Sequence, residues 1–143
     1  MTGVLLGIVT GIVSDVLTKP YVEEVHAETV KEEPKEVKIE LTYTRERIIE
    51  LIKETFPEAP NTAVAIAKCE SGLVPDQVGK TTPDYGVMQI NAPSWDKKAH
   101  KLGYKNYRKD VRENLKMARY VYDGSGNFTP WVCYNTGAYK KFL

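Results

Sequence analysis

The chain has 143 residues, of which 42% are hydrophobic and 27% are charged. This size and composition fit one globular domain and exclude a disordered tail or a bundle of membrane-spanning helices. The formal net charge is only +1. Residues 1–43, however, hold four basic and eight acidic side chains, whereas residues 44–143 hold 16 basic and 11 acidic ones. The body of the chain therefore has a net charge of +5, which favours an anionic partner.

An apolar run from Gly3 to Leu17 lies close to the N-terminus. As a helix it would span roughly 22 Å, less than the ~30 Å hydrocarbon core of a membrane. Its length is typical of a signal peptide, and Ala27 offers a small residue for cleavage, although no Lys or Arg precedes the run. We expect residues 1–27 to be a signal peptide or a membrane anchor, with a buried helix as the alternative. The protein would then be secreted, periplasmic or at the cell surface.

Residues 28–43 are expected to form a charged linker. Its first part, ETVKEEPKE, combines many charges with one proline, as in a solvated spacer. Apolar and polar residues alternate over residues 37–43, which fits an edge strand or an extended chain equally well.

Helical patterns dominate the remaining domain, residues 44–143. A helix with Thr44 as its cap is predicted to continue to Phe56, and two prolines then interrupt the chain. A second helix, capped by Asn61 or Thr62, is predicted to end at Gly72. Because five consecutive residues of this helix are apolar and mostly small, we expect it to be buried.

The second half of the domain begins with turns. Gly, Pro, Thr and Asp are frequent over residues 72–86 and predict turns with a short hairpin. Three further helices are predicted. The first begins at Pro93, the second runs from the cap Asp110 to Gly124, and the third begins at Pro130. The predicted fold class is α+β, mainly α, with a small β-hairpin or irregular region beside the buried helix.

Glu70 lies in the last turn of the buried helix. Desolvation and the negative end of the helix dipole both raise the pKa of a carboxyl there, and a Glu that keeps its proton can act as a general acid. An exposed Glu70, or one paired with Lys68, is the alternative. A hairpin would bring Asp84 towards Glu70, and glycoside hydrolysis uses two carboxylates. A residue that only forms a turn is the alternative for Asp84.

Two segments together resemble the lysozyme-like superfamily: AKCESG (67–72) and DYGVMQIN (84–91). The second is similar to animal-type lysozymes. The ES pair followed by G-x-MQI resembles bacterial lytic transglycosylases of the soluble-lytic (SLT) type, and YNTG (134–137) is similar to their YNAG motif. The chain departs from animal-type lysozymes in a shorter segment between the two carboxylates and in having two cysteines.

The resemblance implies a lysozyme-like fold and cleavage of the β-1,4 bond between N-acetylmuramic acid and N-acetylglucosamine in peptidoglycan. Glu70 would be the general acid, and Asp84 would lie where animal-type lysozymes carry their second carboxylate. Hydrolysis and lytic transglycosylation remain open, since the second reaction requires no second carboxylate. The expected partner is the glycan strand. We expect a monomer with no cofactor and no metal.

Several side chains are candidates for binding the sugar. The amides of Gln89 and Asn91 could bind hydroxyl or N-acetyl groups, although Asn91 could instead cap the next helix. Ser71 could position Glu70 or a sugar. Aromatic rings either stack on sugars or fill the core. The full set of substrate-binding candidates is Ser71, Tyr85, Gln89, Asn91, Trp131, Tyr134 and Asn135.

Cys69 and Cys133 each lie next to an element of the expected site. They could form a disulfide if the last helix packs on the helix that carries Glu70, and an exported protein permits this. Two buried thiols are the alternative.

Other classes of function have weaker support. A cysteine hydrolase would need His100, since His26 lies in the leader, and no motif accompanies it. The two cysteines and two histidines have no zinc-site spacing. Nucleic-acid binding would rest on the charge of +5 alone, so we do not expect it. The alternative that remains is a non-catalytic module that binds the cell wall on the same fold.

Overall fold

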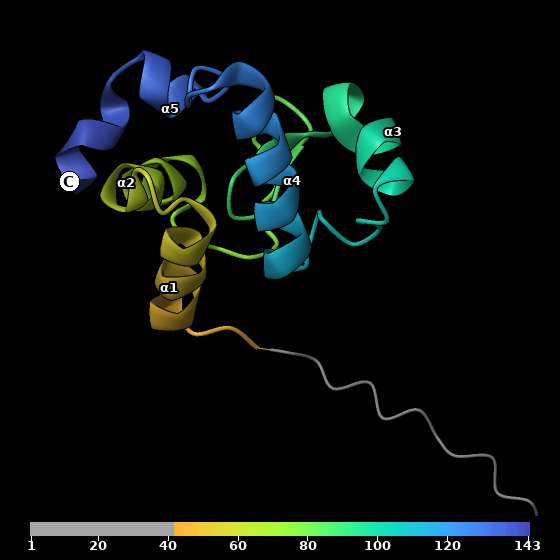
Figure 1. The fold of residues 1–143 in the computed structure, drawn as a ribbon, viewed down its shortest axis with the longest axis horizontal. Helices are drawn as coiled ribbons and strands as arrows, with labels where there is room; N and C mark the ends of the chain where they lie inside the picture. Colours follow the sequence, from red (N-terminus) through yellow and green to blue (C-terminus); the bar gives the residue numbers. More distant parts are fainter. Residues whose placement is uncertain (1–41) are drawn as a thin grey trace, which may run out of the picture. The chain divides into compact units, whose positions relative to one another are not determined.

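A computed structural model of the protein describes residues 42–143. The predicted leader at residues 1–27 and most of the predicted linker lie outside the described residues. The described part is mainly helical with one small antiparallel sheet, which confirms the predicted fold class (Figure 1). Its elements in chain order are α1 (Arg45–Thr55), α2 (Pro60–Ser71), β1 (Asp84–Tyr85), β2 (Ile90–Asn91), α3 (Ala92–Lys101), α4 (Val111–Ser125), α5 (Val132–Asn135) and the 3-10 helix η1 (Ala138–Phe142).

Helix α1 forms as the sequence predicts. The hydroxyl of Thr44 accepts a hydrogen bond from the N–H of Arg47 and so caps the helix. Ile48, Ile52 and Phe56 recur at helical spacing and are fully buried, which fixes this face of α1 against the core.

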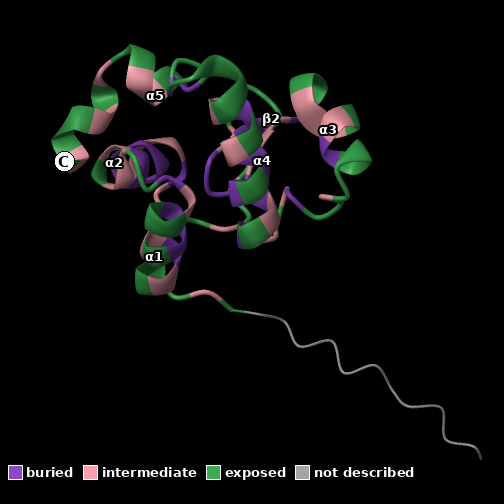
Figure 2. Ribbon diagram, viewed as in Figure 1, coloured by how far each residue is buried: buried purple, intermediate pink, exposed green. Residues whose placement is uncertain are grey.

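Helix α2 is the central element of the core and packs against α1, α5 and η1. All residues from Ala63 to Ala67 are buried, as predicted (Figure 2). The predicted cap at Asn61 or Thr62 is wrong, because the helix already begins at Pro60. A proline suits the first helical position, since its φ is preset and no N–H is needed there. Gly72 ends α2 with a φ of 65°, as predicted.

The hairpin formed by β1 and β2 pairs Asp84 with Asn91 and Tyr85 with Ile90. Asn114 of α4, which is fully buried, holds the turn between the two strands. Its Nδ2 donates to the carbonyls of Tyr85 and Tyr107, both at 2.9 Å, and its Oδ1 accepts from the N–H of Met88 at 2.8 Å. These bonds fix the hairpin to α4.

The last helices differ from the prediction at their ends. Helix α4 passes Gly124 and ends at Gly126, which has the left-handed conformation. The final helix begins at Val132 and not at Pro130. The side chain of Asn127 accepts hydrogen bonds from the N–H and hydroxyl of Thr129 and so holds these residues in a turn.

A disulfide joins Cys69 of α2 to Cys133 of α5, with the two Cα atoms 6.1 Å apart. It closes a loop of 64 residues and fixes the short α5 to the buried helix.

Among the described residues, no helix has the length and hydropathy needed to cross a membrane.

Candidate active site

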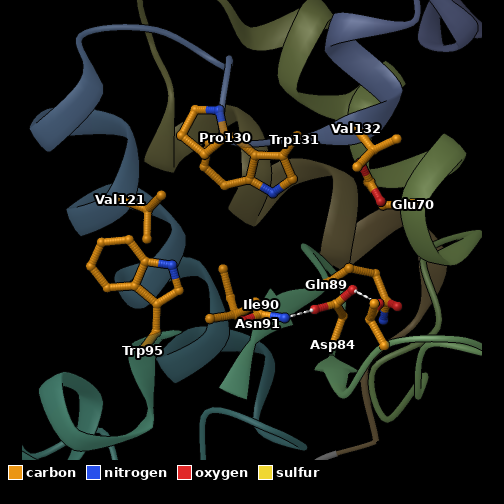
Figure 3. A pocket seen from close by; sticks show the side chains of 11 residues that line it. Glu70, Asp84, Gln89, Ile90, Asn91, Trp95, Val121, Pro130, Trp131 and Val132 are labelled. Carbon is orange, nitrogen blue, oxygen red and sulfur yellow. Dashed lines mark hydrogen bonds between the residues drawn. The ribbon is translucent and has the colours of Figure 1, made fainter. Parts of the chain in front are cut away.

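A pocket of about 300 Å³ lies between the end of α2, the hairpin, α3 and the segment around Trp131 (Figure 3). It contains both carboxylates that the sequence singled out. Its lining residues are Glu70, Thr82, Asp84, Gln89, Ile90, Asn91, Trp95, Val121, Pro130, Trp131 and Val132.

Glu70 is half-buried at the C-terminal end of α2. Its Oε1 accepts a hydrogen bond of 2.9 Å from the backbone N–H of Cys133. Burial raises the pKa of the Glu70 carboxyl, the bond from Cys133 lowers it, and the charge of Asp84 raises it again. The net effect is a pKa above the usual value, as needed for an acid that keeps its proton.

Asp84 enters the pocket from β1 and is held by two neighbours. Its Oδ1 accepts a hydrogen bond of 2.7 Å from Nδ2 of Asn91, and its Oδ2 accepts one from the hydroxyl of Thr82 (Figure 3). Both donors lie on the hairpin and the segment before it, so the carboxylate has a fixed orientation.

Asn91 and Gln89 both line the pocket, but their amides are largely used within the protein. Oδ1 of Asn91 accepts from the N–H and hydroxyl of Ser94, so that Asn91 caps α3. Nε2 of Gln89 donates to the carbonyls of Gln77 and Gly86 at 3.0 and 2.9 Å. These bonds accompany a strained backbone at Gln89, whose φ is 46°.

Two tryptophans contribute to the wall of the pocket. Trp131 is almost fully buried, and its Nε1 donates to the carbonyl of Met88 at 2.8 Å, which fixes the ring beside the hairpin. Trp95 of α3 is half-buried and makes an edge-on contact with Tyr120. The carboxylates thus have an aromatic and largely apolar surrounding.

Four of the predicted substrate-binding residues do not line this pocket. The hydroxyl of Ser71 is buried, donates to the carbonyl of Val87 at 2.7 Å and ties α2 to the hairpin turn. Tyr85 lines a different pocket. Tyr134 stacks on Tyr139, and Asn135 donates to the carbonyl of Thr129.

Sequence reasoning missed the residues that shape the site without reacting. Thr82, Ile90, Val121, Pro130 and Val132 line the pocket, and no local pattern marks them. Asn114 did have a signal, because it is a polar residue on the apolar face formed by Val111, Leu115, Ala118 and Val121.

In the described part of the chain, no group of three His, Cys, Asp or Glu side chains could hold a metal ion.

Comparison with known families agrees with this geometry. The model of the transglycosylase SLT domain matches residues 48–141. Searches of the curated proteins and of the solved structures gave no significant match. SLT domains act on cell-wall peptidoglycan, outside the cytoplasm. The activity of the SLT family is the lytic cleavage of peptidoglycan. The chain belongs to this transglycosylase SLT domain family, within the lysozyme-like superfamily.

Proposed function

We propose that the protein is a lytic transglycosylase that cleaves the β-1,4 bond between N-acetylmuramic acid and N-acetylglucosamine, with Glu70 as its general acid. The observation that carries the proposal is the half-buried Glu70 carboxyl, which lines the pocket and has a raised pKa. A protonated carboxyl in such a pocket can protonate the oxygen of a leaving sugar.

The hydrogen bond from Cys133 suggests which oxygen holds the proton. Oε1 already accepts this bond, and none of the described residues donates to Oε2. We assign the proton to Oε2. In the first step it passes to the glycosidic oxygen, and the bond from that oxygen to the anomeric carbon breaks. In the second step the 6-hydroxyl of the muramic residue attacks the same carbon, and its proton passes back to Oε2. The product is a 1,6-anhydro sugar.

Asp84 has a supporting role in this proposal. Its carboxylate, held by Asn91 and Thr82, would stabilise the positive charge that develops on the sugar ring. No covalent bond to Asp84 is needed. If Asp84 instead acts as nucleophile or activates water, the reaction is hydrolysis, as in lysozymes.

The proposed sugar contacts come from the pocket lining. Trp95, which is half-buried, offers ring surface to a sugar, and the almost fully buried Trp131 contributes only an edge to the wall. Val132 lies at the rim with 69% of its surface exposed. Gln89 Oε1 receives no hydrogen bond from the described residues and can accept one from a sugar hydroxyl or N-acetyl N–H. We further propose that Asn91 and Ser71 act by positioning the two carboxylates.

The remaining proposals concern the setting of the enzyme. We propose that residues 1–27 direct export or anchor the chain in a membrane, that the linker at residues 28–43 connects them to the catalytic domain, and that the domain acts on glycan strands as a monomer. Secretion of a fusion carrying these 27 residues, compared with one lacking them, tests the first point. Retention of the fusion in the cytoplasm would contradict it.

Mass spectrometry of soluble products from purified peptidoglycan tests the reaction. Transglycosylation gives muropeptides with an anhydro end, each lighter by one water than the hydrolysis product. Reducing ends would overturn transglycosylation in favour of hydrolysis. Binding to the wall without any soluble product would favour the non-catalytic module.

A further inference from the structure

A second pocket lies on the other side of the hairpin from Glu70. It is a shallow, open depression of about 680 Å³, and its lining includes Pro83, Tyr85, Asp96, Lys97, His100 and Arg108. Asp84 lines the first pocket and its neighbour Tyr85 lines the second, since successive side chains of a strand point to opposite faces. Strand β1 is therefore a wall shared by both pockets.

Arg108 and Asp96 form an ion pair in the lining of the second pocket, with 42% and 39% of their side chains exposed. The Arg108 guanidinium lies 4.7 Å from the ring centre of Tyr85 and pairs with Asp96 at 2.9 Å. The hydroxyl of Tyr107 donates to the same Asp96 oxygen at 3.1 Å. Lys97 and His100 are exposed as well, and Nε2 of His100 lies 3.9 Å from Oδ1 of Asp96. Lys97 and His100 are therefore available to a ligand, and so is Oδ2 of Asp96, which accepts no hydrogen bond from the described residues.

The region around this pocket also carries the positive charge of the domain. Residues 96–116 hold eight Lys and Arg against three acidic residues, a net charge of +5. The other residues of 44–143 hold eight of each sign, so their net charge is zero. An anionic ligand is therefore attracted to α3 and the segment after it, on the side of the domain away from α2 (Figure 1).

We propose that this second pocket binds the peptide stem of the peptidoglycan strand whose glycan lies in the first pocket. A stem carries carboxylates, an amine and alanine methyl groups, and the pocket offers Lys97 and His100, Asp96, and the apolar Pro83 and Tyr85. This mixed lining fits a peptide better than a uniform polyanion. A stem of four residues reaches roughly 13 Å when extended, enough to pass over a single strand. The inference rests on the proposed function.

Binding of soluble glycan strands of equal length, with and without their stems, tests the inference. The strands without stems are prepared with an amidase that cuts the lactyl–alanine bond. A Glu70→Gln background keeps the strands intact, and any cleavage that persists in it would contradict the proposed function separately. We expect stems to tighten binding about tenfold, the size of one charged hydrogen bond.

Two charge-reversal variants distinguish binding in the second pocket from general attraction to the basic segment. Lys97→Glu is expected to abolish the advantage of the stems. Lys105→Glu, in the same basic segment but outside the pocket lining, is expected to keep most of it. Equal affinity for both kinds of strand, or equal weakening by the two variants, would overturn the proposal. So would tighter binding of a polyglycerol phosphate than of the stem-bearing strand, since that would identify a phosphodiester polymer as the ligand.

Discussion

Cys133 is linked to the catalytic candidate Glu70 in two ways. Its backbone N–H donates to Glu70 Oε1 at 2.9 Å, and its sulfur is bonded to Cys69, the residue before Glu70. The disulfide therefore fixes the short helix α5 at the position where its N–H reaches the carboxyl. A four-residue helix has little stability of its own, so this covalent link determines how well the donor is positioned.

We predict that replacing both cysteines, Cys69→Ser with Cys133→Ser, lowers the free energy of unfolding by about 4 kcal/mol in the chain-entropy model for a loop of this length. Denaturant unfolding measures this loss. The variant should also lose activity at a higher pH than the wild type, because the bond from Cys133 lowers the pKa of Glu70. An unchanged pH profile would mean that the donor stays in place without the disulfide.

Asp84→Asn removes the negative charge that raises the pKa of Glu70. We expect the pH at which kcat falls to move to a lower value, because Glu70 then loses its proton more readily. Turnover should fall by no more than about a hundredfold, the size of one lost electrostatic contact.

Asp76→Asn is the matched control for this variant, because Asp76 is exposed and does not line the pocket. Its pH profile should equal that of the wild type. Complete loss of turnover in Asp84→Asn, with the fold intact, would instead assign Asp84 the role of nucleophile or base.

Gly86 lies where the hairpin turn meets Asn114. A Cβ at Gly86 would lie 2.4 Å from Nδ2 of Asn114, and the φ of Gly86 is 77°. We predict that Gly86→Ala destabilises the domain by about 3 kcal/mol, since one or more of the buried hydrogen bonds of Asn114 must break. Gly72→Ala has a similar φ of 65° but meets no atom within 4 Å, so thermal unfolding should show a smaller loss of about 1 kcal/mol. Equal losses would mean that backbone strain, and not the contact with Asn114, limits Gly86.

The elements that depend on local chemistry were predictable from the sequence. Thr44 as a cap follows from the hydrogen bond that its hydroxyl can accept, and Gly72 as a helix end follows from the tolerance of glycine for a positive φ. The burial of Ala63–Ala67 follows from five consecutive apolar residues, and all three predictions are confirmed. The positions that tertiary contacts determine were not predictable. Tyr134 looked like a cleft residue by motif, but its ring stacks on Tyr139 outside the pocket lining.

The stability of the domain should depend on the ionisation of Glu70. The pKa of Glu70 is raised in the folded state. The contribution of Glu70 to the free energy of unfolding is therefore complete below the pKa of the unfolded state, and it is lost as the pH rises through the pKa of the folded state. Glu70→Gln removes this dependence. We therefore expect the variant to gain stability relative to the wild type between acid and neutral pH, as measured by Tm across that range. A constant difference in Tm over this range would show that the pKa of Glu70 is the same in both states.

Turnover of purified peptidoglycan by Glu70→Gln, beside the wild-type protein, tests the general acid most directly. Gln keeps the size of the side chain and an oxygen to accept the bond from Cys133, but it has no proton to give. We predict that soluble products fall by roughly 10² to 10⁴-fold while binding to the wall is retained. Turnover within a few-fold of the wild type would contradict the assignment of Glu70.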